Sequence, residues 1–204
     1  TIFSIYAIVV SFSTYTCMYA FRKPFAVATF EGMTFWAMDY KTLLIIAQVL
    51  GYTLSKFIGI KVISEMTSQK RVIYLLVLII IAEVALFLFS IVPAPYNIIM
   101  LFFNGLPLGM IWGIVFSFLE GRKVTELLGA GLSVSFIFAS GFVKSVGKIT
   151  IDYLGVSEFQ MPYVTGAIFF LPILLFSYLL SLIPPPTNED ELLRTERVPM
   201  NGKS

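Results

Sequence analysis

Residues 2–30 read IFSIYAIVVSFSTYTCMYAFRKPFAVATF, and this stretch decides the fold class of the chain. It is apolar or weakly polar except at two adjacent cations, Arg22 and Lys23, which Pro24 follows. A membrane span needs about 20 predominantly apolar residues, so the stretch is long enough to cross a bilayer. An ionised side chain inside the bilayer is costly and normally faces protein, water or a bound partner. The pair is therefore a functional-site hypothesis from the outset.

The composition of the whole chain is typical of helical membrane proteins. Of its 204 residues, 58% are hydrophobic and 13% are charged, whereas soluble domains average about 25% charged residues. The apolar segments lack the alternation of a membrane β-barrel. We therefore predict an all-α polytopic membrane protein with six transmembrane helices, at about residues 2–30, 41–60, 72–92, 96–119, 127–151 and 161–183.

The chain divides into two parts. Residues 1–183 are expected to form the six-helix transmembrane bundle, and residues 184–204 a polar cytoplasmic linker or tail. Three prolines at 184–186 end the last helix, and the residues after them are polar and charged. The sequence has no initiator Met and begins in apolar residues, so we expect it to be a fragment that lacks a short N-terminal cytosolic segment.

Basic residues in the loops predict the orientation in the membrane, because cytoplasmic loops carry an excess of Lys and Arg. The loops after the third and fifth spans hold no basic residue. Basic residues follow the second, fourth and sixth spans: Lys61, Lys70 and Arg71, then Arg122 and Lys123, then Arg194, Arg197 and Lys203. Both ends of the chain are therefore expected in the cytoplasm. Arg22 and Lys23 would lie toward the other side, against this rule.

Several classes of function are disfavoured by what the chain lacks. It has one cysteine, Cys17, and no histidine, so it can assemble neither a zinc site nor a Ser-His-Asp triad. We expect no enzyme activity, metal or cofactor. The net charge of +2 gives no reason to expect a nucleic-acid partner.

Other charges in the spans have two interpretations each. Lys56 either faces a cavity opposite Arg22 or snorkels to the cytoplasmic surface. Lys144 and Lys148 share a helical face, with Lys144 a cavity candidate and Lys148 closer to the outer interface. Glu83 fits a protonated residue in a helix interface, or a partner for a lysine, better than a proton relay. The hydroxyl groups of three tyrosines either donate hydrogen bonds into a cavity or belong to packed side chains: Tyr15, Tyr19 and Tyr52.

These charges together predict an anionic substrate. Arg22, Lys23, Lys56 and Lys144 face at most one deep acid, and such a positive interior is costly unless an anion is bound part of the time. The planar fork of Arg suits a carboxylate or phosphate, and an adjacent Lys adds a point charge. We therefore expect Arg22, Lys23, Lys56, Tyr19 and Lys144 to form an anion site.

Two stretches resemble a known family. YAFRKPFAVA, residues 19–28, resembles the first helix of the organic phosphate:phosphate antiporters of the major facilitator superfamily, with matches at Tyr19, Arg22, Lys23 and Phe25. GYTLSKFIG, residues 51–59, resembles their second helix, with matches from Ser55 to Ile58. The family's fifth-helix histidine is absent, and Lys144 matches no family position. The resemblance therefore favours an organic anion more directly than a phosphate ester.

The resemblance implies that the chain is one half of a transporter. Such carriers have two six-helix halves with the substrate between them, so the chain looks like the N-terminal half and would act with a missing C-terminal half. The implied function is transport of a small organic anion across a bacterial inner membrane, with a phosphorylated metabolite as one candidate. A sensor on the same fold is the alternative. A membrane-embedded enzyme is opposed by the lack of a visible nucleophile–base pair.

Overall fold

The computed structural model describes residues 2–64, 66–67, 70–122, 124–187 and 190, and it confirms an all-α polytopic membrane protein. Large apolar side chains face outward on the helices, as on Ile137 (84% exposed) and Leu171 (75%), which suits lipid contact better than water. In these described parts, six helices are long and apolar enough to span a membrane: α1 (Ile2–Tyr19), α2 (Tyr40–Ser64), α3 (Arg71–Ile91), α4 (Ile98–Phe116), α5 (Thr125–Leu154) and α6 (Met161–Ser181).

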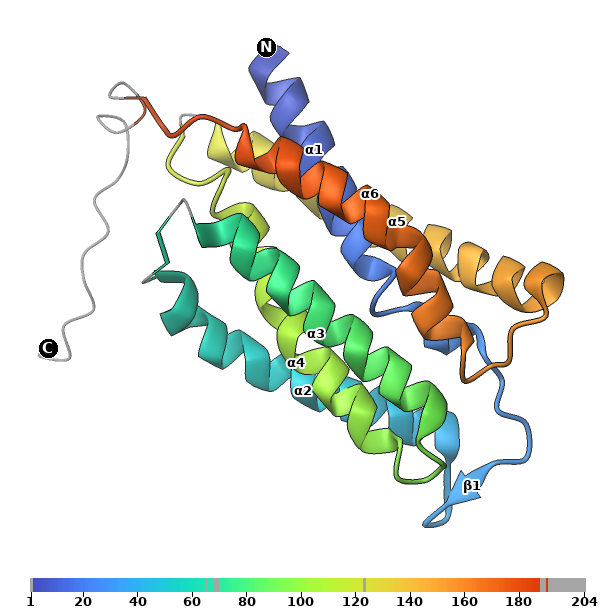
Figure 1. Cartoon of the computed structure of the whole chain (residues 1–204). Helices are drawn as coiled ribbons and strands as arrows, with labels where there is room; N and C mark the ends of the chain where they lie inside the picture. Colours follow the sequence, from blue (N-terminus) through green and yellow to red (C-terminus); the bar gives the residue numbers. More distant parts are fainter. Residues whose placement is uncertain (1, 65, 68–69, 123, 188–189, 191–204) are drawn as a thin grey trace, which may run out of the picture.

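The helices form two groups of three that lie side by side (Figure 1). In one group α4 packs along α2 and α3, and in the other α1 packs along α5 and α6. Contacts of α3 with α6 and of α1 with α4 join the groups. Each helix therefore packs against its neighbours along part of its surface.

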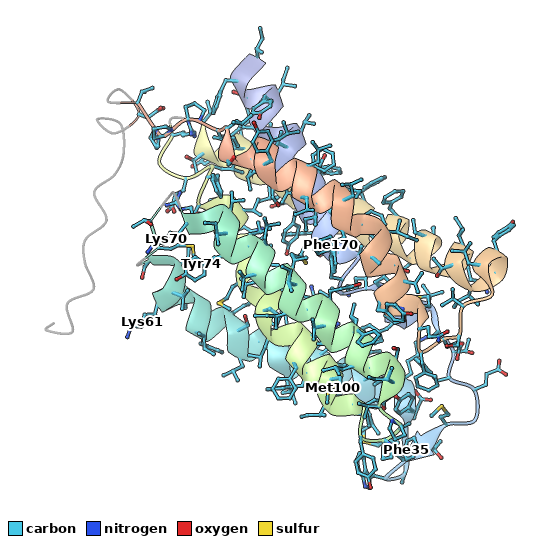
Figure 2. All side chains as sticks on the ribbon, in the orientation of Figure 1. Phe35, Lys61, Lys70, Tyr74, Met100 and Phe170 are labelled. Carbon is cyan, nitrogen blue, oxygen red and sulfur yellow. The ribbon has the colours of Figure 1, made fainter. Side chains whose placement is uncertain are left out.

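The two ends of the bundle differ in charge. Lys61 and Lys70 lie together at one end, whereas Phe35 and Met100 lie toward the other (Figure 2). Arg71 and Arg122, at the start of α3 and just before α5, also belong to the first end, which we call the basic end. Four residues of the predicted basic loops and tail, Lys123, Arg194, Arg197 and Lys203, are outside the described residues, as is most of the predicted 184–204 tail.

The first predicted span is not one continuous helix, which corrects the expectation for residues 2–30. α1 ends at Tyr19, and a short 3-10 helix, η1 (Pro24–Val27), follows the break. Pro24 explains the interruption, because it has no N–H to donate and its ring would clash with the carbonyl of Ala20 in an α-helix. Arg22 and Lys23 therefore lie in the break and not within a helix.

A small hairpin and an aromatic cluster close the end opposite the basic end. β1 (Thr34–Phe35) pairs antiparallel with β2 (Met38–Asp39), a feature that the sequence did not predict. We call this end the hairpin end. Beneath it the ring of Phe30 packs at 5.2 Å, centroid to centroid, against both Tyr40 and Phe159. Phe30 thus joins the segment after η1 to α2 and to the loop before α6.

Candidate functional site

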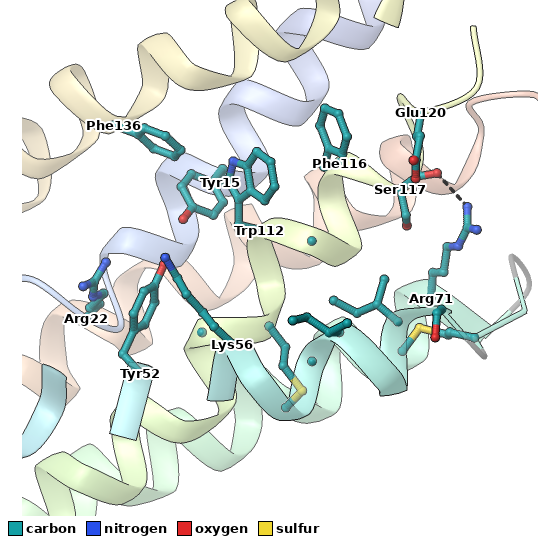
Figure 3. A pocket seen from close by; sticks show the side chains of 18 of the residues that line it. Tyr15, Arg22, Tyr52, Lys56, Arg71, Trp112, Phe116, Ser117, Glu120 and Phe136 are labelled. Atoms are coloured by element: carbon teal, nitrogen blue, oxygen red, sulfur yellow. Dashed lines mark hydrogen bonds between the residues drawn. The ribbon is translucent and has the colours of Figure 1, made fainter. Parts of the chain in front are cut away.

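A cavity of about 890 Å³ lies mainly between α1, α2 and α4 and contains most of the predicted anion site. Small-molecule sites typically enclose about 300–1,000 Å³, so the volume suits a metabolite. Three of the five predicted residues, Tyr19, Arg22 and Lys56, line it. Figure 3 shows Arg22 and Lys56 gathered beside Tyr52 at one end of the cavity. We call this the cation end.

Tyr52 brings the two cations together. The guanidinium carbon of Arg22 lies 3.8 Å from the centroid of the Tyr52 ring, and Lys56 Nζ lies 5.0 Å from it. Both distances are within the roughly 6 Å over which a cation is attracted to an aromatic ring. Tyr52 and Lys56 are one turn apart on α2, whereas Arg22 follows α1. An anion bound here would offset the repulsion between the two like charges.

The guanidinium of Arg22 has hydrogen-bonding capacity to spare. Its Nε is buried and has no hydrogen-bond partner among the described residues, which is unusual for a buried polar atom. In the described lining of the cavity the one acid is Glu120, which lies with Arg71 and Ser117 away from the cation end (Figure 3). The cation end is therefore suited to accept a carboxylate or phosphate from a ligand.

Two side-chain amides hold the break that carries Arg22. Gln48 Nε2 donates to the main-chain carbonyl of Arg22 at 3.0 Å, and to Asn104 Oδ1 at 2.8 Å. Asn104 Nδ2 in turn donates to the carbonyls of Phe21 and Ala82, each at 3.0 Å. Carbonyls released by a helix break in lipid need such partners. The sequence reasoning missed both amides, although Gln and Asn inside apolar spans were a visible signal.

The cation end lies well within the length of the helices. Gln48 and Asn104 are eight and six residues into α2 and α4, or about 12 and 9 Å from the hairpin end at 1.5 Å per residue. Tyr52 is twelve residues into α2, or about 18 Å. Since the Arg22 side chain stacks on Tyr52, it points toward the middle of the span and not to the nearer surface.

Close contact between α2 and α4 fixes the position of Tyr52. A Cβ added to Gly109 would lie 2.5 Å from the carbonyl oxygen of Tyr52 and 2.6 Å from the Cβ of Ser55. A Cβ added to Gly105 would lie 2.3 Å from the carbonyl oxygen of Gln48. These glycines therefore bring the α2 backbone onto α4, as expected for small residues at helix interfaces in membranes.

Aromatic side chains from α1 and α5 form another part of the wall. Tyr15 is 1% exposed, and its ring contacts Tyr19 at 5.4 Å and Phe136 at 5.3 Å, both edge to face. All three residues line the cavity. Tyr15 and Tyr19, both cavity candidates from the sequence, therefore belong to the cavity wall, and Phe136 is a lining residue that the sequence did not suggest.

Lys23 and Lys144 do not line this cavity. Both are half-buried, and Lys23 lies near enough to Arg22 and Lys144 for their charges to act on it. Lys148, one turn beyond Lys144, pairs with Asp152 at 3.0 Å on an exposed face of α5. The structure thus places Lys23 and Lys144 close to each other, outside the described lining of the cavity.

Glu83 lies in the interface between α3 and α6. One carboxylate oxygen, Oε2, is buried without a hydrogen-bond partner among the described residues. The same oxygen would lie only 2.1 Å from a Cβ added to Gly166 on α6. Gly166 therefore makes the space that the carboxyl group occupies, and Glu83 is a helix-interface residue and does not line the cavity.

No ligand set for a metal ion is evident in the described part of the chain. A search of those residues finds no group of three or more His, Cys, Asp or Glu side chains that could hold one. The described lining of the cavity supplies Arg, Lys and Tyr side chains, which can bind charged groups and donate hydrogen bonds.

Comparison with known proteins identifies a family whose description names no function. No curated protein and no solved structure matches the chain significantly. Residues 24–204 match a protein family that is described only as a family of unknown function. The match covers α2–α6 and begins directly after Arg22 and Lys23, so it includes Tyr52 and Lys56. The chain belongs to this family, DUF5690.

Proposed function

We propose that the chain is the N-terminal six-helix half of a major-facilitator-type secondary transporter that moves a small organic anion, a phosphorylated metabolite being one candidate. The observation that carries the proposal is the meeting of Arg22 and Lys56 at the ring of Tyr52, inside a cavity deep in the bundle. Two cations held at that depth are costly unless an anion occupies the site for part of the cycle.

The break after α1 supports a transport site. Secondary transporters commonly bind substrate where a membrane helix is discontinuous, near the middle of the bilayer. Here the discontinuity supplies Arg22, and the amides of Gln48 and Asn104 stabilise it. The stretches around Arg22 and Lys56 also resemble the first two helices of the organic phosphate:phosphate antiporters.

Alternating access would use a second half of the protein. The anion would bridge Arg22 and Lys56 to cations of a C-terminal half, and its binding would draw the two halves together. A ligand shifts such an equilibrium only by binding one state more tightly than the other, so the bridged state must make more contacts with the anion.

The proposal includes an orientation. Lys61, Lys70, Arg71 and Arg122 gather at the basic end, which supports a cytoplasmic location for that end by the positive-inside rule. Both ends of the chain would then face the cytoplasm, in the inner membrane of a bacterium.

Anion exchange by the full-length protein tests this function. Proteoliposomes loaded with inorganic phosphate should take up radiolabelled methyl phosphate or phenyl phosphate. Arg22→Ala and Lys56→Ala should each lower uptake at least about 10-fold, the effect of about 1.4 kcal/mol of lost binding. Lys148→Ala is the matched control, because this lysine pairs with Asp152 on an exposed face.

The outcomes separate the alternatives. Uptake that is the same in Arg22→Ala and wild type would contradict the assignment of Arg22 to the anion site. If the protein binds the anion in an Arg22-dependent manner but shows no uptake, the result would favour a sensor over a transporter. Neither binding nor uptake of any anion would contradict the proposed function as a whole.

A further inference from the structure

Beyond the cation end, the cavity has a wall of aromatic rings on α4. Trp112 and Phe116 are one turn apart, and their rings stack with centroids 4.9 Å apart and planes inclined by 8°. Both residues are half-buried and line the cavity. Figure 3 shows them between the cation end and the group of Arg71, Ser117 and Glu120. The stack therefore lies where the body of a ligand would extend from the cations.

The other lining of this region is also mostly apolar. Ile60 and Ile63 of α2 and Met110 of α4 line the cavity there. From Lys56 to Ile63 is seven residues, or about 10 Å along the helix. A bare phosphate or a small carboxylate at the cation end would leave this length unoccupied.

The polar groups at the far end of the cavity, Arg71, Ser117 and Glu120, are separate from the cation end. Arg71 Nη1 donates to the main-chain carbonyl of Ser117 at 2.8 Å, and its guanidinium carbon lies 5.6 Å from the ring of Phe118. Arg71 is thus held by the segment after α4, although its Nε, like that of Arg22, is buried without a hydrogen-bond partner among the described residues. The cation end suits an anionic group better than Arg71 does, because two cations meet there at one ring, and the rest of the ligand meets mostly apolar surface.

We infer, resting on the proposed function, that the substrate is an amphiphilic organic anion with an aromatic body. Its carboxylate or phosphate lies against Arg22 and Lys56, and its ring packs against Trp112 and Phe116. A ligand with an apolar body covers the apolar wall of the cavity, and burying this surface away from water favours binding. Aromatic pairs add a preference beyond the area that they bury, so a ring is favoured over an aliphatic chain of similar size.

Calorimetric titration of the purified full-length protein tests the inference with three phosphate monoesters. Methyl phosphate carries the head alone, butyl phosphate adds an aliphatic chain, and phenyl phosphate adds a ring. We expect phenyl phosphate to bind at least about 10-fold more tightly than methyl phosphate, equivalent to about 1.4 kcal/mol, and more tightly than butyl phosphate. Arg22→Ala should weaken all three.

Variants of Trp112 and Phe116 test whether their stacked rings cause the preference for phenyl phosphate. Trp112→Leu should reduce the affinity for phenyl phosphate toward that for methyl phosphate and leave methyl phosphate unchanged, whereas Trp112→Phe should keep most of the preference. Phe116→Leu serves as the second variant if Trp112→Leu does not fold, as judged by its melting temperature.

The possible results separate a failure of the aromatic-substrate inference from a failure of the proposed function. Equal, Arg22-dependent affinities for methyl and phenyl phosphate would overturn the aromatic substrate and keep the anion site. Equal affinities for butyl and phenyl phosphate would overturn the preference for a ring. A preference for phenyl phosphate that persists in Trp112→Leu and Phe116→Leu would overturn the placement. Failure of all three esters, and of the matching carboxylates acetate, butyrate and benzoate, to bind would overturn the proposed function as well.

Discussion

Gln48 Nε2 donates a hydrogen bond to the main-chain carbonyl of Arg22 over 3.0 Å, although the two residues belong to different spans. The same amide donates to Asn104 Oδ1, and Asn104 reaches the carbonyls of Phe21 and Ala82. One pair of side chains therefore ties α2, α3 and α4 to the break after α1. The position of Arg22 is set by hydrogen bonds to its backbone, which leaves its guanidinium available for a ligand.

Removing either amide should destabilise the bundle. Gln48→Leu and Asn104→Leu leave buried carbonyls unpaired, and each change should cost about 1–3 kcal/mol of the free energy of unfolding. Denaturant unfolding of the full-length protein in detergent measures this loss. Gln160→Leu, at an exposed position before α6, is the matched control. If Gln48→Leu and Gln160→Leu unfold alike, the amide pair does not support the break.

The contact between α2 and α4 should tolerate no side chain at Gly105. Gly105→Ala would force a methyl group to 2.3 Å from the backbone oxygen of Gln48, and overpacking of this kind costs about 1–3 kcal/mol or more. Gly113→Ala should cost less, because its near neighbour is the flexible end of Ile63. Melting temperatures in detergent compare the variants.

Gly141→Ala provides the control for these glycine substitutions. A Cβ at this α5 position meets no atom within 4 Å, and alanine favours a helix over glycine by about 1 kcal/mol. The melting temperature should therefore stay the same or rise. An equal loss of stability in Gly105→Ala and Gly141→Ala would show that close packing is not the cause.

The ring of Tyr52 should contribute to anion affinity by holding Arg22 and Lys56. A cation over an aromatic ring gains about 0.5–2 kcal/mol, so Tyr52→Leu should weaken phosphate-ester binding about 2- to 30-fold. Tyr52→Phe keeps the ring and should retain most of the affinity. Calorimetric titration with phenyl phosphate checks both variants. An equal loss in Tyr52→Phe and Tyr52→Leu would assign the role to the hydroxyl group instead.

The helices could be predicted from the sequence because a bilayer requires every span to be apolar and long enough to cross it. α3 was expected at 72–92 and spans Arg71–Ile91, and α6 was expected at 161–183 and spans Met161–Ser181. Arg22 and Lys56 could also be selected, since a charge in an apolar span is conspicuous. The major facilitator relationship and the anion substrate stay predictions.

Other features depend on contacts that a linear sequence does not display. Gln48 and Asn104 are uncharged, and only the fold shows that they meet the carbonyls of the break. Helical spacing placed Lys144 and Lys148 on one face but could not say that this face lies away from the cavity. The hairpin turn has positive φ at Trp36 and Ala37, where glycine or asparagine would have been the recognisable signal.

The hydrogen bonds between the segment after η1 and the loop that joins α5 to α6 should make stability depend on pH. The carboxylate of Glu158 accepts hydrogen bonds from the backbone N–H groups of Thr29, at 2.6 Å, and Phe30, at 2.8 Å. Burial raises the pKa of Glu158, but these bonds, the Thr29 hydroxyl and nearby Lys41 outweigh burial and hold the pKa below its usual range. The folded state therefore prefers the ionised carboxylate.

A depressed pKa contributes stability above the unfolded-state pKa, which is about 4.3 for Glu, and this contribution is lost as the pH falls through the folded-state pKa. Wild type should therefore melt higher than Glu158→Gln near neutral pH, and the difference should shrink as the pH falls below about 4.3. Glu31→Gln, at an exposed residue nearby, should show no such trend. A difference between wild type and Glu158→Gln that stays constant down to the lowest pH would mean that the carboxylate charge does not hold this loop, leaving the aromatic packing of Phe30 as its main anchor.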